Sequence, residues 1–353
     1  MNILLLTRYG RLGASSRVRF EQYVPYIREA GHQVAIQPLF DDDYLRRLYA
    51  GDSLDWFRIA INYCKRIKLL WHSGGYDLVW LEAEVLPWLP TWGEAFLNSR
   101  NIPYVVDYDD AIFHRYNMHQ SALVRTLLGR KIDKVMRRAA LVVGGSEYLV
   151  EYAVAAGAQE VVYLPTVVDM NRYSAKGAAA KEDFTIGWIG SPMTVGYLSL
   201  IETALAEIGK EKGVRVVLVG GRASPLKGVH PEIVDWAEAA ECSAINLFDV
   251  GIMPLPDSPW ERGKCGYKLI QYMASGIPVV ASPVGANCTI VDHGVDGFLA
   301  DTPAEWINSL RVLKDSPQLR AKLGSSGRAK VRQKYSLQTT APRLIALLSK
   351  TAG

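Results

Sequence analysis

The sequence predicts an α/β fold in which two doubly wound parallel sheets follow one another along the chain. Short apolar runs typical of buried strands alternate with segments of helical periodicity from one end of the 353 residues to the other. Such alternation produces parallel sheets that are covered by helices on both faces. The length also exceeds what one hydrophobic core commonly serves, so we expect two domains.

The first domain is predicted over residues 1–165. Its strands are the apolar runs at 3–6, 34–36, 78–81, 104–106 and 141–143, and its helices include the periodic segments 17–30 and 124–139. A linker is predicted over 166–182, where Pro165 precedes a run of small and charged residues.

The second domain is predicted over residues 183–336, where the alternation resumes. Its strands lie in FTIGWIG, VRVVLVGG, FDVGIMPL and IPVVAS. The last segment, 337–353, is predicted to hold a helix that returns to the first domain. Ligands of doubly wound sheets bind where the strands end and the helices begin, so the loops at those ends are the candidate sites.

Composition argues against several classes of protein. Lys plus Arg is 40 and Asp plus Glu is 36, a net charge of +4 that is too mild to indicate a nucleic-acid partner. The four cysteines form no C-x-x-C pair, and we interpret them as reduced thiols. The N-terminal apolar run is shorter than the core of a signal peptide, and no run approaches the ~20 apolar residues of a membrane span. We therefore expect a cytoplasmic protein that does not cross a membrane.

The loop TRYGRLGASSRVRF follows the first predicted strand. The loop contains two glycines, of which Gly13 is the second. A dinucleotide-binding fingerprint has a third glycine, so the loop disfavours a dehydrogenase. We interpret the loop as a tight turn that faces a ligand, with Ser15 or Ser16 capping the next helix. Arg17 and Arg19 oppose the helix dipole in that first turn, and either a solvated surface or an anionic ligand would explain them.

The matching loop of the second domain is IGWIGSPMTVGYL. Ser191 and Thr194 lie between a strand and a helix, where free main-chain N–H groups can bind an anion. The alternative is a Ser-Pro helix start with Pro192 in the first turn.

The stretch GKCGYKLIQYMASGIPVVASPVGAN combines an apolar helical stripe with polar residues on the opposite face. Lys264 and Lys268 fall one turn apart, and Gly266 allows the backbone to approach a ligand closely. Two ammonium groups at the start of a helix are suited to a diphosphate. The alternative is that both are ordinary surface lysines, which need no ligand.

Several stretches together resemble a known family. FDVGIMPLPDSPWERGKCGYKLIQYMASGIPVVASPVGAN, with VDHGVDGFLA and EW after it, is similar to the C-terminal domain of the group 1 glycosyltransferases, glycosyltransferase family 4. GHQVAIQP, VVGGSEYL and YLPTVVD resemble the N-terminal domain of the same family. The resemblance implies a GT-B fold, in which two Rossmann-like domains face each other across a cleft that holds a nucleoside-diphosphate-sugar. It also implies retention at the anomeric carbon, no metal and no further cofactor.

The resemblance assigns expected roles to the residues of these loops. It places Gln271 at the ribose, and the turn that contains Gly285 and Asn287 at the donor sugar. Around the diphosphate it places Gly13, Ser191, Thr194, Lys264, Gly266 and Lys268.

Two departures from the family pattern concern the donor. Members commonly carry two glutamates separated by seven residues, and Gly263 and Gln271 stand at those positions here. Gln271 can still bond ribose hydroxyls without charge assistance, whereas Gly263 has no side chain to offer. The arginine that members carry after the first strand of the second domain is replaced by Ser191 and Pro192.

The acidic stretch VVDYDDAIFHRYN supplies the candidate catalytic residues. Asp107 and Asp109 imitate the D-x-D metal motif of the other glycosyltransferase fold, an interpretation that a GT-B scaffold disfavours. We expect Asp109 and Asp110 to face the acceptor or the reacting sugar, where a carboxylate stabilises developing positive charge. The alternative is that they only cap the next helix. His114 and Arg17 are expected on the acceptor side, although a single His is more often structural.

Two segments, 44–71 and 125–138, predict a surface that contacts anionic membranes. Basic helices with interleaved aromatic side chains bind such membranes, and buried aromatics under a solvated charged face are the alternative. The first segment contains Tyr44, Tyr49, Trp56, Phe57, Tyr63 and Trp71 with Arg46, Arg47, Arg58, Lys65, Arg66 and Lys68. The second contains Arg125, Arg130, Lys131, Lys134, Arg137 and Arg138.

These observations together predict a retaining, metal-independent glycosyltransferase of polysaccharide biosynthesis, peripheral on the inner face of the cytoplasmic membrane. It would move a sugar from a nucleotide-sugar to a glycan or lipid-linked acceptor. A nucleotide-sugar epimerase of the same fold is one alternative. A non-catalytic partner subunit is another, because both family glutamates are missing.

Overall fold

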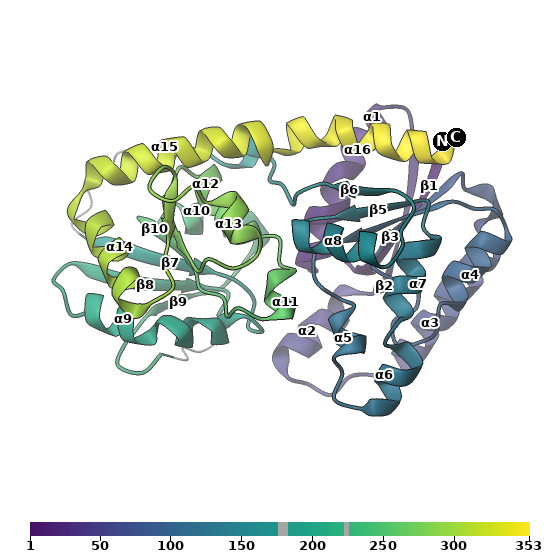
Figure 1. The fold of residues 1–353 in the computed structure, drawn as a ribbon, viewed down its shortest axis with the longest axis horizontal. Coiled ribbons are helices and arrows are strands. Elements are labelled where there is room, and N and C mark those ends of the chain that lie inside the picture. The colour runs from purple at the N-terminus through teal and green to yellow at the C-terminus, as the bar shows by residue number, and fades with distance from the viewer. Residues whose placement is uncertain (176–182, 222–225) are drawn as a thin grey trace. The chain divides into compact units, whose positions relative to one another are not determined.

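The computed structural model describes residues 1–175, 183–221 and 226–353, so the end of the predicted linker, 176–182, lies outside the described residues. The chain divides into two compact units. Unit 1 comprises Met1–Thr166, Arg262–Cys265 and Thr340–Gly353, and unit 2 comprises Val167–Glu261 and Gly266–Thr339. Each unit is built on a sheet with helices on both faces (Figure 1).

Unit 1 contains a parallel sheet with the strand order β2-β1-β3-β4-β5-β6. The order reverses between β1 and β3, because the chain first moves outward to β2 and then crosses to the other side of β1. In such sheets the carboxyl ends at this reversal form the preferred place for a ligand. The strands are β1 (Asn2–Tyr9), β2 (Gln33–Phe40), β3 (Leu78–Glu82), β4 (Tyr104–Tyr108), β5 (Leu141–Gly144) and β6 (Val161–Tyr163).

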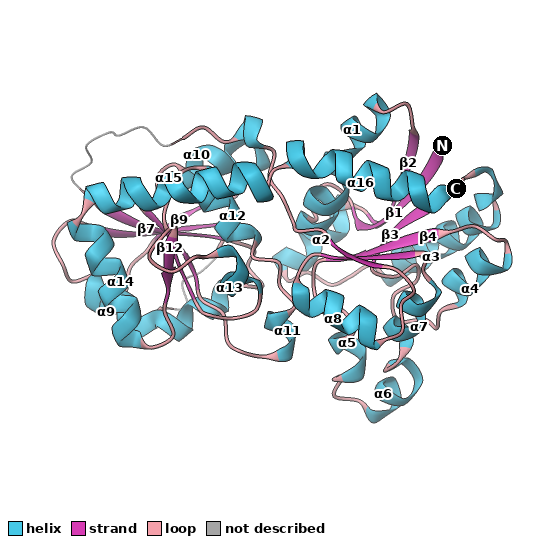
Figure 2. Cartoon of the chain, turned by 45° about the horizontal axis from the view of Figure 1, so that its top comes forward, coloured by secondary structure: helices cyan, strands magenta, loops and turns pink. Residues whose placement is uncertain are grey.

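Helices cover both faces of this sheet, with α1 and α16 on one side and α3, α4 and α7 on the other (Figures 1 and 2). The central strands are buried along their whole length, as the continuous apolar runs require. The helices are α1 (Val24–Glu29), α2 (Asp42–Ala50), α3 (Trp56–Trp71), α4 (Trp92–Ser99), α5 (His114–Asn117), α6 (Ala122–Leu128), α7 (Lys131–Arg138), α8 (Glu147–Ala155) and α16 (Leu337–Ala352).

Unit 2 contains a second parallel sheet, with the order β12-β11-β10-β7-β8-β9 and its reversal between β7 and β10. The loops after those two strands are therefore the preferred ligand position in this unit. The strands are β7 (Phe184–Ile189), β8 (Val214–Val219), β9 (Glu232–Val234), β10 (Val250–Met253), β11 (Val279–Ala281) and β12 (Gly297–Leu299).

Two apolar cores lie on opposite faces of the second sheet. One is built around α12 and the other around α9 and α14, so each face is closed by its own helix layer (Figure 2). The helices are α9 (Glu202–Ile208), α10 (Glu241–Ile245), α11 (Pro259–Arg262), α12 (Tyr267–Ala274), α13 (Ala286–Ile290), α14 (Pro303–Asp315) and α15 (Pro317–Lys334). Among the described residues, no helix is both long and apolar enough to cross a bilayer.

Two helices that were predicted as single segments are interrupted. Residues 17–30 form a π-helical turn (Ser16–Phe20), a 3-10 turn (Glu21–Tyr23) and then α1, because Pro25 starts a new helix at its first turn. Residues 124–139 divide into α6 and α7 at Gly129, where a Cβ would come within 2.2 Å of the Arg125 carbonyl oxygen. The three-residue edge strands β6, β9 and β12 were not predicted, although the equally short β11 was, within IPVVAS.

Candidate functional site

Charged side chains gather at the carboxyl ends of β1 and β3 in unit 1. Glu82 is 6% exposed, and its Oε2 accepts hydrogen bonds from the main-chain N–H of Arg8 and the hydroxyl of Ser16, both at 2.7 Å. The Ser16 hydroxyl also accepts a bond from the Tyr9 N–H at 3.1 Å. The prediction that Ser16 caps the next helix is therefore wrong, because its hydroxyl joins the ends of two strands instead.

Burial raises the pKa of the Glu82 carboxyl from 4.5 to about 7, and the charge of Asp109 adds to this shift. The bonds from Arg8 and Ser16 act in the opposite direction but do not cancel it. The carboxyl thus changes its proton occupancy close to neutral pH. It is a feature of the strand ends that the sequence analysis did not identify.

Arg19 and Asp107 form a buried ion pair in unit 1. The Arg19 Nε and Nη2 donate to the same Asp107 oxygen at 3.0 and 2.6 Å, and Nη1 donates to the Leu164 carbonyl at 2.8 Å. The alternative of a solvated surface for Arg17 and Arg19 is wrong, since their side chains are 5% and 2% exposed. Asp107, the first aspartate of the stretch that imitates the D-x-D metal motif, is thus bonded to an arginine.

Asp109 and Asp110 follow β4, and both are bonded from other segments. The Asp110 Oδ1 accepts a bond from the Lys264 Nζ at 3.3 Å, and Ser15 bonds the Asp109 side chain. Burial raises the pKa of both carboxyls, and the Lys264 ammonium opposes the rise. The helix that follows, α5, has no side-chain cap, so the capping alternative for these carboxylates is wrong. Within the described ranges, no three His, Cys, Asp or Glu side chains group as metal ligands.

The segment Arg262–Cys265 is fixed against the loop after β4. The Cys265 thiol donates to the Asp109 carbonyl at 3.0 Å, and the Ser146 hydroxyl donates to the Gly263 carbonyl at 3.3 Å. A Cβ at Gly263 would lie 2.6 Å from the Ala111 Cβ. This contact explains why a glycine, and no glutamate, stands at that position.

His114 and Arg17, predicted on the acceptor side, and Gly13, predicted at the diphosphate, all have contacts within unit 1. The His114 ring nitrogens lie 2.9 Å from the Asn117 Oδ1 and 2.7 Å from the Tyr148 hydroxyl. The Arg17 Nη1 donates to the Arg11 carbonyl at 3.0 Å. Gly13 packs against Tyr9, whose Cβ would be 2.6 Å from a Cβ at this glycine, so the turn after β1 requires it.

In unit 2 the structure brings Lys268 of α12 beside the loop that follows β7. Its ammonium lies 5.5 Å from the ring centroid of Trp188, and its Cε would be 2.8 Å from a Cβ at Gly190. These contacts place a cation at the strand-order reversal of this sheet. The Ser191 carbonyl accepts from the Thr194 main-chain N–H at 3.0 Å and from its hydroxyl at 3.2 Å. The Ser-Pro helix start is wrong, since the 3-10 helix begins at Val195.

Gly266 and Asn287 also lie together in unit 2. Gly266 precedes α12 with φ 64°, a conformation that favours glycine, and a Cβ there would lie 3.7 Å from the Asn287 Oδ1. The Asn287 Nδ2 donates to the Ser282 carbonyl at 3.0 Å. Gly285 precedes α13 with φ 52°. The loops after β10 and β11 therefore meet beside the start of α12.

Gln271 is 3% exposed, so its side chain lies inside unit 2. Its Nε2 donates to the Tyr173 hydroxyl at 3.1 Å, and that hydroxyl donates to the Glu241 Oε1 at 3.3 Å. The polar chain that contains Gln271 was not predicted, because its members come from segments far apart in the sequence.

Some side chains of the predicted basic and aromatic surface are exposed, and others are buried. Arg66 is 2% exposed and bonds the carbonyls of Thr7 and Gln37 at 2.8 Å, and Lys131 is 3% exposed and pairs with Glu84 at 2.5 Å. Both were expected at the surface, and this expectation is wrong, because Arg66 donates to carbonyls of β1 and β2 and Lys131 pairs with a buried carboxylate.

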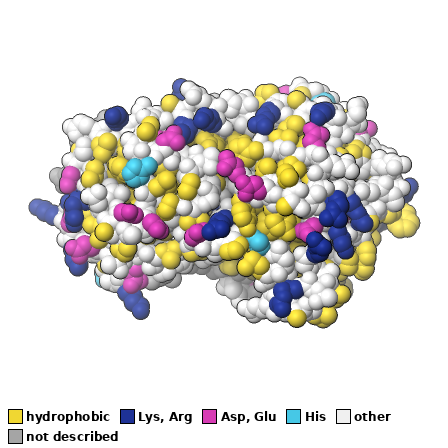
Figure 3. All heavy atoms as spheres, viewed as in Figure 1, with side chains coloured by type: hydrophobic (Ala, Val, Ile, Leu, Met, Phe, Trp, Pro, Cys, Tyr) yellow, Lys and Arg dark blue, Asp and Glu magenta, His cyan; other side chains and the backbone are white. Residues whose placement is uncertain are grey.

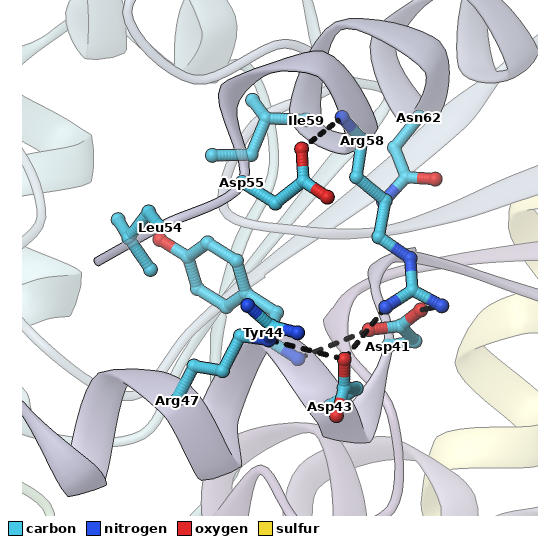
Figure 4. A pocket seen from close by; sticks show the side chains of 9 residues that line it. All are labelled: Asp41, Asp43, Tyr44, Arg47, Leu54, Asp55, Arg58, Ile59 and Asn62. Carbon is cyan, nitrogen blue, oxygen red and sulfur yellow. Dashed lines mark hydrogen bonds and ion pairs between the residues drawn. The ribbon is translucent and has the colours of Figure 1, made fainter. Parts of the chain in front are cut away.

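Carboxylates also neutralise part of the basic side chains on α2 and α3. Arg58 pairs with Asp41 and Asp43, and Arg47 with Asp43, at distances of 2.6 to 3.7 Å (Figure 4). The exposed basic side chains that remain include Lys65, Lys68 and Lys134. On the face shown in Figure 3, basic and hydrophobic side chains lie side by side over α6 and α7.

Comparison with known proteins finds similarity over part of the chain. Residues 183–315 match the family model described as Glycosyl transferases group 1. A D-inositol 3-phosphate glycosyltransferase of Thermobispora bispora is 32% identical over 40% of this chain and 29% of its own length. The human alpha-1,3/1,6-mannosyltransferase ALG2 is 29% identical over 23% of this chain and 20% of its own length. The aligned region thus spans less than a third of these curated relatives.

Solved structures are similar over the whole chain. Anabaena HepE in complex with UDP has a TM-score of 0.73 and 18% identity, with coverage of 99% of this chain and 100% of that chain. Sucrose-phosphate synthase from Thermosynechococcus elongatus has a TM-score of 0.73 and 13% identity, with coverage of 99% and 98%. These similarities confirm the predicted fold, GT-B with two parallel-sheet domains.

Proposed function

Since this chain carries a domain of the group 1 glycosyl transferases over residues 183–315, we propose that it is a glycosyltransferase that acts on a nucleoside-diphosphate-sugar. In this proposal the sugar is transferred with retention, without a metal ion, to a glycan or lipid-linked acceptor. Solved structures of the same fold were obtained with UDP and with UDP-glucose, which supports a uridine nucleotide as the first donor to test.

The observation that carries the proposal is the grouping at the strand-order reversal of unit 2. Lys268 lies beside the loop after β7, and Gly266 and Asn287 lie where the loops after β10 and β11 meet. A cation beside close main-chain turns suits a diphosphate, because charge-assisted bonds and main-chain N–H donors both favour phosphoryl oxygens. Ser191, Thr194 and Gly285 belong to the same loops and complete the proposed donor site.

The proposed chemistry needs no strong enzymic base. In a retaining transfer the leaving phosphate can itself accept the proton of the acceptor hydroxyl, so the carboxylates of unit 1 need only orient the substrate and stabilise charge. Asp109 and Asp110 are assigned this role, because both follow the end of β4 and each has a partner that favours its ionised form, Ser15 for Asp109 and Lys264 for Asp110.

The acceptor side is proposed to include contact with an anionic membrane. Trp56, Phe57 and Trp71 of α3 are 75%, 77% and 65% exposed, and Leu123 and Leu127 of α6 are 67% and 68% exposed. Exposed lysines and arginines accompany these apolar side chains on both segments. Exposed aromatic and basic side chains together favour anionic bilayers.

Calorimetric titration with UDP, GDP, dTDP and CDP, each with and without a chelator, tests the donor proposal. We expect one nucleotide to bind with micromolar affinity and the chelator to leave that affinity unchanged. Binding that disappears with the chelator would contradict metal independence. A wild-type protein that binds none of the four would contradict the transferase and favour a non-catalytic partner subunit.

Lys268→Ala tests where the nucleotide binds. Loss of a charge-assisted bond is expected to weaken nucleotide binding roughly 10- to 100-fold. Lys322→Ala, which removes an exposed lysine of α15, is the matched control and is expected to change nothing. Unchanged affinity in Lys268→Ala would remove this lysine from the proposed site.

A further inference from the structure

Glu261 is a buried carboxylate at the end of the loop that follows β10. It lies in α11 and is 7% exposed, although Pro259 and Arg262 of the same turn are exposed. Its side chain therefore points into unit 2, of which it is the last residue before the chain passes to Arg262–Cys265 of unit 1. A carboxylate buried to this degree needs donors for its oxygens.

Two hydroxyl groups supply those donors, and they come from two different segments. The Tyr197 hydroxyl donates to the Glu261 Oε1 at 2.5 Å. The Ser258 hydroxyl, which belongs to the same loop as Glu261, donates to the other oxygen, Oε2. A carboxylate accepts stronger and shorter hydrogen bonds than a neutral group does. The bond from Tyr197 thus ties α11 to a segment that lies 64 positions earlier in the sequence.

The segment tied in this way follows β7. Tyr197 belongs to a 3-10 helix, Val195–Ile201, of seven residues. Runs of 3-10 helix longer than about four residues are uncommon, because the hydrogen bonds within them have poor geometry. The bond from Tyr197 to Glu261 therefore adds a contact from outside that holds this helix in place.

The start of the 3-10 helix borders the proposed diphosphate site. The Tyr197 main-chain N–H donates to the Thr194 carbonyl at 3.2 Å, and the Thr194 N–H donates to the Ser191 carbonyl at 3.0 Å. The position of Tyr197 thus affects that of the loop Ser191–Thr194. This is the loop that is proposed to present main-chain N–H groups to a phosphate.

The bond between Tyr197 and Glu261 also joins the loops on either side of the strand-order reversal in unit 2. Tyr197 follows β7 and Glu261 follows β10, and the order of the sheet reverses between these two strands. Lys268 lies beside the loop after β7 as well, with its ammonium 5.5 Å from the ring centroid of Trp188. Glu261 is therefore placed to hold together the elements of the proposed donor site.

We propose that Glu261 is a positioning residue of the donor site, which acts through the Tyr197 hydroxyl to hold the loop Ser191–Thr194 in the conformation that binds the diphosphate. Both oxygens of Glu261 already accept hydroxyl bonds, so its role does not require contact with the nucleotide. Its loss is expected to weaken the binding of phosphoryl groups and to leave the binding of the nucleoside part unchanged. The inference rests on the proposed function, since it concerns the donor site proposed there.

Calorimetric titration of UDP and of uridine into the full chain tests the inference. If another of the four nucleotides binds in place of UDP, that nucleotide and its nucleoside are used. Glu261→Ala and Tyr197→Phe are each expected to weaken UDP binding about tenfold and to leave the uridine affinity within about twofold. Glu261→Gln keeps one acceptor oxygen and is expected to recover part of the UDP affinity. Glu207→Ala, at an exposed glutamate of α9, is the matched control and is expected to bind UDP like wild type.

Two results would overturn the inference. Equal losses of UDP and uridine affinity would show a general structural role, and unchanged UDP affinity in both Glu261→Ala and Tyr197→Phe would show no role. The double variant tests the bond itself, because Tyr197→Phe is expected to add less than about twofold once Glu261 is alanine. Circular dichroism melting checks each variant, and Tyr197→Phe, which removes a single hydroxyl, keeps the test if Glu261→Ala does not fold.

Hydrogen exchange of the ligand-free protein separates this inference from the proposed function. In Glu261→Ala the main-chain amides of residues 194–201 are expected to exchange at least about fivefold faster than in wild type, whereas those of α14 keep their rates. Faster exchange in a protein that binds none of the four nucleotides would contradict the transferase, although Glu261 would still hold the loop. Nucleotide binding by wild type, with unchanged exchange and affinity in the variants, would contradict the role of Glu261 and leave the donor proposal standing.

Discussion

The ammonium of Lys264 lies 3.3 Å from the Asp110 carboxylate, although 154 positions separate the two residues in the sequence. Both belong to unit 1, whereas Lys268, predicted to share a diphosphate with Lys264, belongs to unit 2. The Lys264 charge is thus partly balanced by a carboxylate. The two lysines therefore belong to different units, and it is Lys268 that lies beside the loop after β7, where the diphosphate is proposed to bind.

Asp109→Asn and Asp110→Asn test the proposed catalytic carboxylates. Each is expected to lower kcat by about 10²–10³, because a carboxamide cannot stabilise developing positive charge. Nucleotide affinity is expected to stay within about twofold, since neither side chain belongs to the proposed donor site. Steady-state transfer assays and calorimetry measure the two quantities.

Asp52→Asn is the control for this pair, because Asp52 is an exposed carboxylate of the same unit. A kcat equal to that of wild type in both Asp109→Asn and Asp110→Asn would show that these carboxyls have a structural role only.

Glu82→Gln is expected to change how stability depends on pH. Burial and the charge of Asp109 raise the pKa of Glu82 from 4.5 to about 7 in the folded protein. The folded state therefore binds this proton more tightly than the unfolded state. The carboxyl's contribution to the free energy of unfolding is largest below pH 4.5 and is lost as the pH rises to about 7.

As the pH rises between these two values, the free energy of unfolding of wild type is expected to fall by up to about 3 kcal/mol relative to that of Glu82→Gln, whose carboxamide does not titrate. Urea denaturation of both proteins across this range measures the difference. Glu29→Gln, at an exposed glutamate, controls for net charge. Parallel pH profiles for wild type and Glu82→Gln would contradict the raised pKa.

Gly266→Ala is expected to destabilise unit 2 more than Gly276→Ala. Both glycines have φ near +70°, at 64° and 73°, so alanine costs about 1–2 kcal/mol of backbone strain at either. At Gly266 the added Cβ would also lie 2.3 Å from the Ile290 Cδ1, whereas at Gly276 the nearest atom is 3.9 Å away. We expect a further 1–3 kcal/mol, roughly, from this overlap.

Ile290→Val removes the overlapping Cδ1 atom and provides a check. In the Gly266→Ala background it is expected to restore part of the lost stability, although alone it costs about 0.5–1.5 kcal/mol. Equal costs for the two glycine variants, measured by urea denaturation, would show that the contact with Ile290 is relieved without strain.

Membrane contact is tested by sedimentation with vesicles. Wild type is expected to pellet with anionic vesicles at low salt and to be released at high salt, because charge attraction is screened. The double variant Trp56→Ser with Phe57→Ser is expected to bind at least about tenfold more weakly, through the loss of apolar area.

Val154→Ser removes an apolar side chain of α8 that is 61% exposed, and it is expected to bind vesicles like wild type. Retention that is equally poor on neutral and anionic vesicles would reject the membrane proposal.

The sequence by itself determined the architecture and the position of the candidate loops. Apolar runs separated by helical segments have few arrangements other than parallel sheets covered on both faces, and these runs are the buried strands β3, β4 and β5. The start of α12 directly after Gly266 was likewise predictable, because an apolar stripe at helical spacing begins there.

Only the tertiary structure decided which charged side chains are buried. Arg66 and Lys131 were expected at the surface, and Arg19 either there or beside an anionic ligand. Instead Arg19 bonds Asp107, 88 positions away, and Lys131 bonds Glu84, 47 positions away. Periodicity describes one element at a time, whereas the free energy of a buried charge depends on a partner that another strand supplies.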